Sequence, residues 1–249
     1  MTRKLVAAFA CRAGGSRLYG KPLQNLEPGT TILDQIIASA KSSPVVSEIV
    51  LGISEGRENL VFVDAAERYG IGHIIGSEKD VLWRLVQCGR AGNATDVLRL
   101  TTECPFAAWE LLPRMWQNHV RNGNDITVVD FLPEGMSFEI YTLAALEKSH
   151  REGDDGERSE FCSAYARRRS DLFKIEIGTP PDGWNRLDLR VTVDYPEDLI
   201  LAREIYRALK PKAPHIPVPD ILAFLDEHPE LTRLVEPYVY AKPLWAKET

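Results

Sequence analysis

Short apolar runs alternate with amphipathic stretches through the first half of this chain. The runs have the length of buried strands, and the stretches between them repeat apolar residues at helical spacing. We predict strands at residues 4–9, 48–53, 72–75, 97–100 and 126–129. We predict helices at residues 31–40, 59–69, 80–88 and 109–119, the first opened by a capping box of Thr31 and Asp34. This alternation predicts a mainly parallel sheet covered by helices on both faces.

The pattern changes after Asp130. Residues 131–141 are predicted to be a loop followed by a short apolar segment, and the charged, glycine-containing residues 151–160 a solvated connector. Two late strands are predicted at residues 173–177 and 187–193. The remaining helices are predicted at residues 143–150, 196–209, 218–227 and 230–235, with Pro196 in the first turn of the second.

The first predicted strand leads into a loop rich in glycine and positive charge, residues 10–23, which reads A-C-R-A-G-G-S-R-L-Y-G-K-P-L. Glycine has no Cβ, so backbone N–H groups can come close to an anion. Arg12, Arg17 and Lys21 bring cationic donors to the same place. A strand followed by such a loop predicts a phosphate cradle.

Two familiar phosphate loops fit this segment poorly. Gly15 to Lys21 matches G-x-x-x-x-G-K, but the next residue is Pro22, which lacks the hydroxyl that would hold magnesium and disfavours helical dihedrals at Lys21. The dinucleotide fingerprint G-x-G-x-x-G is absent. A basic surface turn remains the alternative to a phosphate site.

Composition narrows the class of protein. The chain has 249 residues, which suits one large domain or a domain with an extension, and its net charge of -6 argues against binding nucleic acid through the phosphate backbone. The four cysteines are far apart in the sequence, so we expect reduced thiols in a cytoplasmic protein, with Cys11 a buried structural thiol. We see no signal-peptide core and no membrane span.

Two acidic residues follow predicted strands. Glu103 comes after residues 97–100, and Asp194 comes after residues 187–193. If these strands are parallel neighbours of the first, both carboxylates lie at the same edge of the sheet as the glycine-rich loop. Carboxylates are typical ligands of Mg²⁺ beside a polyphosphate. The alternative is that each is a loop or cap carboxylate, with Asp194 capping the helix that follows.

The glycine-rich loop resembles the signature of the CMP-sugar synthetases, which include the 3-deoxy-manno-octulosonate and acylneuraminate cytidylyltransferases. The wider chain resembles the cytidylyltransferases of spore coat polysaccharide biosynthesis. The similar segments keep the family's order: G-S-E-K-D-V-L-W-R (76–84), V-L-R-L-T-T-E-C-P (97–105), P-E-G-M-S-F-E (133–139), R-S-E-F-C-S (158–163), T-V-D-Y-P-E-D-L (192–199) and D-I-L-A-F-L-D-E-H-P-E-L (220–231). The resemblance therefore covers nearly the whole chain.

The resemblance implies an α/β fold, the three-layer α/β/α sandwich of nucleotide-diphospho-sugar transferases with a mixed, mainly parallel sheet. It implies one domain over residues 1–249, with residues 131–185 as an acceptor-side and dimerisation insertion and residues 210–249 as a helical C-terminal extension. The activity it implies is transfer of CMP from CTP to an acidic sugar, with Mg²⁺ and release of pyrophosphate, for a surface glycan. It further implies a homodimer.

The resemblance also implies roles for individual residues. The catalytic residues would be Arg12 and Lys21, and Lys21 would stabilise charge at the α-phosphate. The acceptor would be bound by Glu139 and Arg158, and Mg²⁺ by Glu103 and Asp194. The nucleotide would be bound by Ala10, Arg12, Gly14, Gly15, Ser16, Arg17, Lys21, Asp80 and Arg84.

The chain departs from the family pattern at four positions. The family usually has Asp at Glu103, glycine at Thr102, histidine at Phe161 and a polar residue at Cys11. These departures leave the phosphate cradle intact but bear on the acceptor and the metal. The alternatives are a nucleotidyltransferase with another nucleotide or with a phosphosugar or phosphonate acceptor, and a degenerate nucleotide-binding member. The D-x-D motif of related glycosyltransferases is absent.

Overall fold

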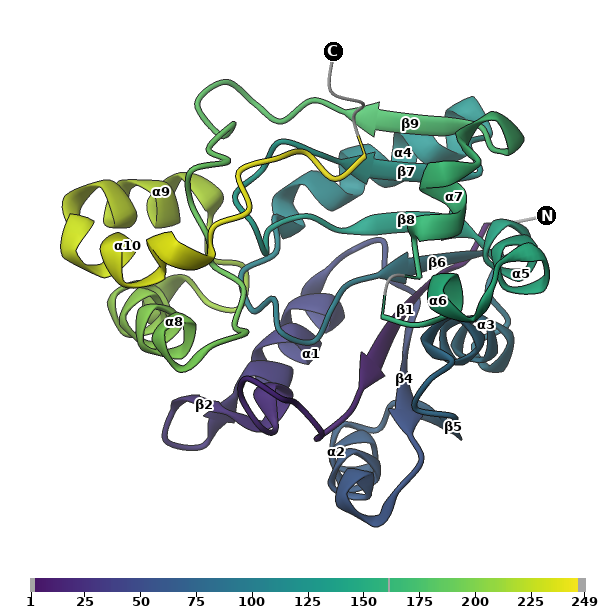
Figure 1. Ribbon diagram of the computed structural model, residues 1–249, viewed down its shortest axis with the longest axis horizontal. Coiled ribbons are helices and arrows are strands. Elements are labelled where there is room, and N and C mark those ends of the chain that lie inside the picture. The colour runs from purple at the N-terminus through teal and green to yellow at the C-terminus, as the bar shows by residue number, and fades with distance from the viewer. Residues whose placement is uncertain (1–2, 161, 246–249) are drawn as a thin grey trace.

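A seven-stranded sheet forms the centre of the protein in a computed structural model that describes residues 3–160 and 162–245 (Figure 1). Its strand order is β5-β4-β1-β6-β8-β7-β9. Strand β8 is antiparallel to both of its neighbours, and every other pair is parallel. The strands are β1 (Leu5–Cys11), β4 (Glu48–Ser54), β5 (Gly72–Gly76), β6 (Asp96–Arg99), β7 (Ile126–Val129), β8 (Glu139–Thr142) and β9 (Ile175–Gly178).

Helices cover both faces of this sheet. Alternate residues of β1 divide between the two cores: Leu5, Ala7 and Phe9 face one, and Val6 and Ala8 face the other. The first core is packed by α1 (Ile32–Ser42), α2 (Val61–Tyr69), α4 (Leu112–Asn122), α8 (Pro196–Leu209) and α9 (Val218–Glu227). The second is packed by α3 (Val81–Ala91), α5 (Leu143–Glu152) and α7 (Ala164–Arg168). The predicted three-layer sandwich with a mixed, mainly parallel sheet is confirmed.

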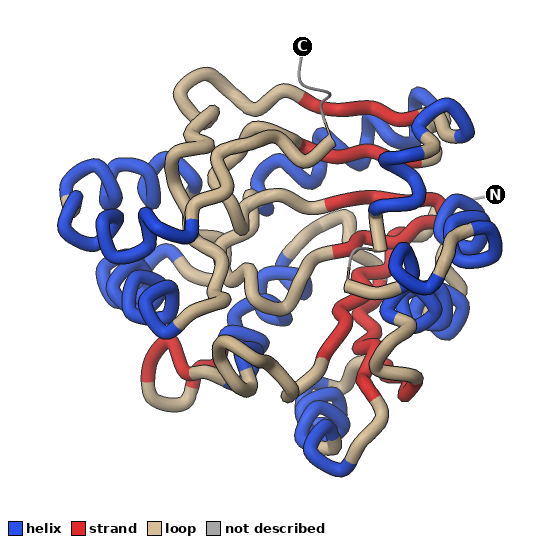
Figure 2. Tube along the Cα trace, viewed as in Figure 1, coloured by secondary structure: helices blue, strands red, loops and turns tan. Residues whose placement is uncertain are grey.

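The remaining elements lie around this sandwich. A hairpin of β2 (Asn25–Glu27) and β3 (Thr30–Thr31) precedes α1, and α6 (Asp155–Arg158) and α10 (Pro229–Val235) are short helices. Figure 2 shows long loops gathered between the strands and the helices α8 to α10. These loops include those that follow the carboxyl ends of β1 and β6. We predicted the functional groups at this edge of the sheet.

Several local predictions are confirmed. Thr31 caps α1: its hydroxyl accepts the Asp34 N–H at 3.1 Å while the Asp34 carboxylate accepts the Thr31 N–H at 2.8 Å. Pro196 is the first residue of α8. Local signals of this kind identify an element's start because they depend on residues only a few positions apart.

One prediction made after Asp130 is wrong and two are incomplete. Residues 187–193 are not a strand and form only one isolated bridge, from Arg190 to Glu134, because this alternating apolar run is buried against loops and not against a neighbouring strand. Residues 139–142 form strand β8, where we predicted only an apolar segment. Residues 151–160 are not a mere connector, because a capping box of Asp154 and Glu157 starts α6 there.

A buried carboxylate joins the amino end of β6 to α4. Asp96 accepts hydrogen bonds from Arg3 Nε at 2.6 Å, from the Thr95 hydroxyl at 2.6 Å and from His119 Nε2 at 3.0 Å. The other His119 ring nitrogen bonds the Thr127 hydroxyl of β7 at 2.8 Å. Burial opposes ionisation of Asp96, but the bonds from His119, Arg3 and Thr95 outweigh it and lower the pKa of this carboxyl.

We predict that Asp96→Asn lowers the free energy of unfolding by about 3 kcal/mol, because it leaves Arg3 without its buried counter-charge. A lowered folded-state pKa stabilises the fold above the unfolded pKa, so this difference should be full at pH 7 and shrink as the pH falls below about 4. Urea unfolding at several pH values measures it. The control is Asp171→Asn, the same change at an exposed position. Equal losses in the two variants would contradict this role.

Candidate active site

The loop that directly follows β1 is a tight bend whose fold requires glycine at two positions. Gly20 has a left-handed backbone with φ of 61°, and its N–H donates to the Ala13 carbonyl at 2.7 Å. A Cβ on Gly15 would stand 2.5 Å from the Leu18 carbonyl oxygen. The Ala13 N–H is held from outside the loop by the Asn59 side chain at 2.7 Å. The intervening residues 14–17 are therefore presented to solvent.

This bend borders a cavity of about 380 Å³, which we call the loop compartment. The side opposite the bend is formed by the segment after β6, with Glu103, and by Asp194 from the segment before α8. The sequence-predicted residues that line it are Ala10, Arg12, Gly14, Gly15, Ser16, Arg17, Lys21, Arg84, Glu103 and Asp194. The cationic loop and the two candidate metal carboxylates thus share one cavity.

Asp194 lies among three cations. Its carboxylate is bonded by the Lys21 ammonium, by Arg17 at 3.2 Å and by Arg190 at 2.9 Å. Burial acts against the charge, but the bond from Lys21 and the fields of Lys21, Arg17 and Arg190 lower the pKa of this carboxyl. Asp194 is therefore ionised at neutral pH. It does not cap α8, whose N-cap residue is Tyr195.

Glu103 is the less satisfied of the two carboxylates. Its backbone carbonyl accepts the Val193 N–H at 2.8 Å, which holds the two acidic segments together. Its side chain makes no hydrogen bond within residues 3–160 and 162–245. Burial raises the pKa of the Glu103 carboxyl, partly opposed by Lys21, and the nearby Asp194 raises it further. Its oxygens remain available to a cation.

The pair of carboxylates suits a magnesium ion. Magnesium takes oxygen ligands and keeps several waters or phosphate oxygens, so one or two protein carboxylates are enough. In the described part of the chain, no group of three or more His, Cys, Asp or Glu side chains is arranged to hold an ion by itself. Glu103 and Asp194 could therefore hold Mg²⁺ only together with the oxygens of a bound substrate and water.

A buried guanidinium lies behind the loop. Arg84, which is 1% exposed, donates to the carbonyls of Gly52 at 2.6 Å and Cys11 at 3.3 Å, at the carboxyl ends of β4 and β1. Its Nε has no partner among the described residues, and burial lowers the pKa of the group. No carboxylate in the described part of the chain forms an ion pair with it. An uncompensated buried cation beside this cavity favours an anionic ligand.

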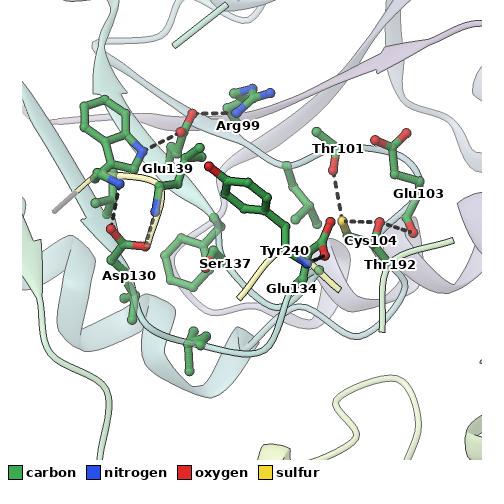
Figure 3. A pocket seen from close by; sticks show the side chains of 18 of the residues that line it. Arg99, Thr101, Glu103, Cys104, Asp130, Glu134, Ser137, Glu139, Thr192 and Tyr240 are labelled. Carbon is green, nitrogen blue, oxygen red and sulfur yellow. Dashed lines mark hydrogen bonds and ion pairs between the residues drawn. The ribbon is translucent and has the colours of Figure 1, made fainter. Parts of the chain in front are cut away.

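A second cavity of about 310 Å³ adjoins the first, and we call it the carboxylate compartment (Figure 3). The two cavities share Arg99, Leu100, Thr101, Glu103 and Asp194, so they meet at the two candidate metal ligands. The second is lined further by acidic and polar side chains, among them Asp130, Glu134, Ser137, Glu139 and Thr192. A molecule in one compartment would therefore contact a molecule in the other beside Glu103 and Asp194.

Glu139 is bound inside the carboxylate compartment. Its carboxylate accepts from Arg99 at 2.7 Å, from the Tyr141 hydroxyl at 3.3 Å and from the Trp245 indole at 2.8 Å. The register of the sheet explains the first contact, because Arg99 of β6 is paired with Glu139 of the antiparallel β8. The compartment is thus bordered by a buried ion pair and by the C-terminal part of the chain.

Two predicted residues lie away from both compartments. Asp80 and Arg158 line a third cavity of about 800 Å³ on the other side of Arg12. Asp80 caps α3 through the Trp83 N–H at 2.8 Å and pairs with His150 at 2.9 Å, while Arg158 donates to the His150 carbonyl at 2.9 Å. Glu139 and Arg158, expected on one acceptor side, therefore lie in different cavities. The Phe161 departure lies outside the described residues.

One basic residue of the site, Arg190, was not predicted from the sequence. Arg190 is buried and bonds Asp194 at 2.9 Å, Asp198 at 2.9 and 3.0 Å, and Glu134 at 2.5 Å. Arg190 takes a polar position of the alternating run 187–193, in phase with Asp188 and Thr192. An arginine there is ordinarily exposed, so the pattern gave no signal of its burial.

Two general expectations can also be compared with the structure. Cys11 is a buried free thiol, and burial raises its pKa to about 12, so the prediction of a structural thiol is confirmed. Among residues 3–160 and 162–245, none of the helices has both the length and the apolar character that crossing a bilayer requires.

Comparison with known proteins gives relatives along nearly the whole chain. No family model matches. The spore coat polysaccharide biosynthesis protein SpsF of Bacillus subtilis is 25% identical over 224 residues, which are 88% of this chain and 92% of SpsF. The uncharacterised protein MJ1063 of Methanocaldococcus jannaschii is 25% identical over 231 residues, which are 93% of this chain and 94% of that protein.

Solved structures agree on the fold. A cytidylyltransferase of Leptospira borgpetersenii superposes with a TM-score of 0.82 at 23% identity, over 93% of this chain and 97% of that one. A CMP:2-keto-3-deoxy-manno-octonic acid synthetase solved with CTP gives 0.62 at 13% identity, over 82% and 99%. The similarity to SpsF confirms the resemblance stated above, and the two solved structures show that this chain has the fold of those enzymes. The chain is a relative of the spore coat polysaccharide biosynthesis protein SpsF, built on the fold of the cytidylyltransferases.

Proposed function

We propose that this protein is a cytidylyltransferase that transfers CMP from CTP to an acidic sugar and releases pyrophosphate, as a step in the synthesis of a surface glycan. The observation that carries the proposal is the paired cleft, in which a glycine-lined cationic loop faces Glu103 and Asp194 where a second compartment begins. Phosphates, metal and acceptor would meet at that boundary.

The loop compartment is assigned to the nucleotide. The exposed backbone of Gly14 and Gly15 and the side chains of Arg12, Ser16 and Arg17 would bind the triphosphate, as donors around an anion. The Lys21 ammonium bonds Asp194, so it would lie near the α-phosphate and stabilise the charge that grows there. The buried charge of Arg84 adds to the positive potential around the same phosphates.

Magnesium is assigned to Glu103 and Asp194. The ion would supply electrostatic stabilisation of the phosphate oxygens during transfer. The residues of this chain prepare for it: Lys21, Arg17 and Arg190 keep Asp194 ionised, and the Val193 N–H fixes the Glu103 backbone beside it.

The carboxylate compartment is assigned to the acceptor. An acceptor hydroxyl oxygen would form a bond to the α-phosphorus while the bond from that phosphorus to the bridging oxygen breaks. Pyrophosphate leaves with that electron pair, and the hydroxyl proton goes to solvent. Glu139 and Arg99 lie in this compartment and would orient the acceptor, whereas Asp80 and Arg158 would meet only a part of a substrate that extends past Arg12.

Two broader assignments belong to the same proposal. We propose a homodimer formed through residues 131–185, which the family resemblance implies and analytical ultracentrifugation would test. We also propose a cytoplasmic location. The four cysteines are free and buried, which suits a reducing compartment.

The direct test measures pyrophosphate release with each of the four NTPs, Mg²⁺ and a panel of ulosonic acids, phosphosugars and phosphonates. We expect turnover with CTP and an ulosonic acid. Turnover with another pair would identify a nucleotidyltransferase of different specificity. Binding of CTP without turnover would identify a nucleotide-binding protein, and failure to bind any NTP with Mg²⁺ would refute the proposal.

We predict that Lys21→Ala lowers kcat by about 10²- to 10³-fold, since it removes one donor at the developing charge. The melting temperature should hardly change, because Asp194 keeps its bonds to Arg17 and Arg190. Steady-state kinetics and thermal unfolding measure the two effects. The control is Lys148→Ala, a half-buried lysine that lines neither compartment and donates to the Leu172 carbonyl. Normal turnover in a destabilised Lys21 variant would show that this lysine is structural.

We predict that Glu103→Gln raises the Mg²⁺ concentration for half-maximal activity by about tenfold or more, because an amide oxygen is a weaker ligand than a carboxylate. Stability should not fall. A raised pKa means that folding disfavours the ionised side chain, so the neutral amide relieves that penalty at pH 7. Mg²⁺ titrations and urea unfolding measure both effects, with exposed Asp182→Asn as the control. An unchanged Mg²⁺ requirement would remove Glu103 from the metal site.

A further inference from the structure

The chain returns to the carboxylate compartment at its C-terminal end. After α10 it runs back toward β7 and β8 (Figure 1), and residues 240–245, which we call the C-terminal strap, lie along the compartment. The strap is bound through its own donors. The N–H groups of Leu244 and Trp245 donate to Asp130 at 3.0 and 2.6 Å. The N–H of Tyr240 reaches Glu134 at 3.3 Å.

Trp245 makes the most buried of these contacts. Its indole N–H donates to Glu139 at 2.8 Å, and its ring lies 6.4 Å from that of Tyr141. Glu139 is 4% exposed and also bonds Arg99 of the boundary between the two compartments. A hydrogen bond to a carboxylate that is buried in an ion pair is among the stronger kinds in proteins. Trp245 therefore fastens the strap to the ion pair at the base of the compartment.

The strap is a wall of the compartment and does not fill it. With the strap in place the cavity still measures about 310 Å³, within the range of small-molecule sites, which begins at about 300 Å³. Tyr240, Lys242, Leu244 and Trp245 all line it. Tyr240 is 60% and Leu244 48% exposed, so much apolar surface stands at the mouth of the cavity.

The strap is also connected to the candidate metal site. Arg190 bonds the Tyr238 carbonyl at 3.2 Å just before the strap, and the same guanidinium bonds Glu134 and Asp194. Glu134 in turn accepts the Tyr240 N–H. The start of the strap and the Asp194 carboxylate therefore share one buried arginine, which fixes the strap relative to the place of the reaction.

We propose that the C-terminal strap is the specificity-determining wall of the acceptor site, held closed by Trp245 and Asp130. This inference rests on the proposed function, because it requires that the carboxylate compartment receives the acceptor. The strap contributes Tyr240, Lys242 and Leu244 to the surface that an acceptor touches. Its loss removes acceptor contacts and opens the compartment to water, while the loop compartment stays intact because no strap residue lines it.

The test compares the whole chain with a chain ending at Val239 and with Trp245→Phe, which keeps an aromatic ring but removes the indole donor. The assay is pyrophosphate release with CTP, Mg²⁺ and the ulosonic acid that the whole chain turns over fastest. We expect the truncation to raise the acceptor KM more than tenfold and Trp245→Phe to raise it about tenfold, the size of one hydrogen bond to a charged group. The KM for CTP should change less than twofold in both.

The matched control is Trp184→Phe, the same change at a partly buried tryptophan packed against the main core. It should leave both KM values unchanged. A second readout is amide hydrogen exchange in the free protein. We expect protection at Leu244 and Trp245 that is lost in Asp130→Ala, since Asp130 accepts both N–H groups.

The outcomes separate this inference from the proposed function. An active truncated chain with an unchanged acceptor KM overturns the inference and leaves the proposed function standing. Rapid exchange of both amides in the whole chain also overturns it. If the whole chain turns over no acceptor on the panel with any NTP, the proposed function fails and the inference falls with it. A rise in acceptor KM confined to the truncation and Trp245→Phe supports the strap as a wall.

Discussion

The cleft depends on the burial of Arg190 among carboxylates. Its guanidinium is 4% exposed and bonds Glu134, the neighbouring Asp194 and Asp198, and the Tyr238 carbonyl, which belong to three separate segments of the chain. A buried cation is unfavourable unless its donors are paired, so these segments must lie where the guanidinium can reach them. This requirement fixes the position of Asp194. Because Lys21 and Arg17 of the cationic loop bond Asp194, it also fixes that loop. One arginine thereby organises both sides of the loop compartment.

The charged groups around this network differ in how well their charges are compensated by partners. Asp194 has three cationic partners, whereas the Glu103 side chain has no hydrogen bond in the described part of the chain and a raised pKa. Arg84 is a buried cation bonded only to carbonyls. A polyphosphate with a divalent cation would supply the anion and the metal that these groups lack. A ligand of this kind would therefore compensate both groups, which supports the assignment proposed for the loop compartment.

The residues predicted correctly from sequence are those whose placement depends on near neighbours. The glycines and cations at residues 12–21 and the capping box of Thr31 and Asp34 act over a few positions, and each lies as expected. We predicted the correct edge of the sheet for Asp194, but from a strand at residues 187–193 that does not form. The alternating run before it reports burial, which a strand and a buried loop share, so periodicity could not tell that residues 187–193 lack a strand partner.

The carboxylate compartment is built by non-local pairing, and only the family resemblance, not the residue pattern, pointed to Glu139. Strand β8 runs against its neighbours, so its first residue, Glu139, lies at the carboxyl end of β6 beside Arg99. A parallel strand in the same place would bring its last residue to that edge. Reversing one strand therefore supplies the ion pair to which Trp245, 106 positions further on, is fastened. Since neither this reversal nor the return of the C-terminus leaves a periodic signal, the residue pattern did not predict how the carboxylate compartment is built, whereas the cations of the loop compartment could be predicted from one loop.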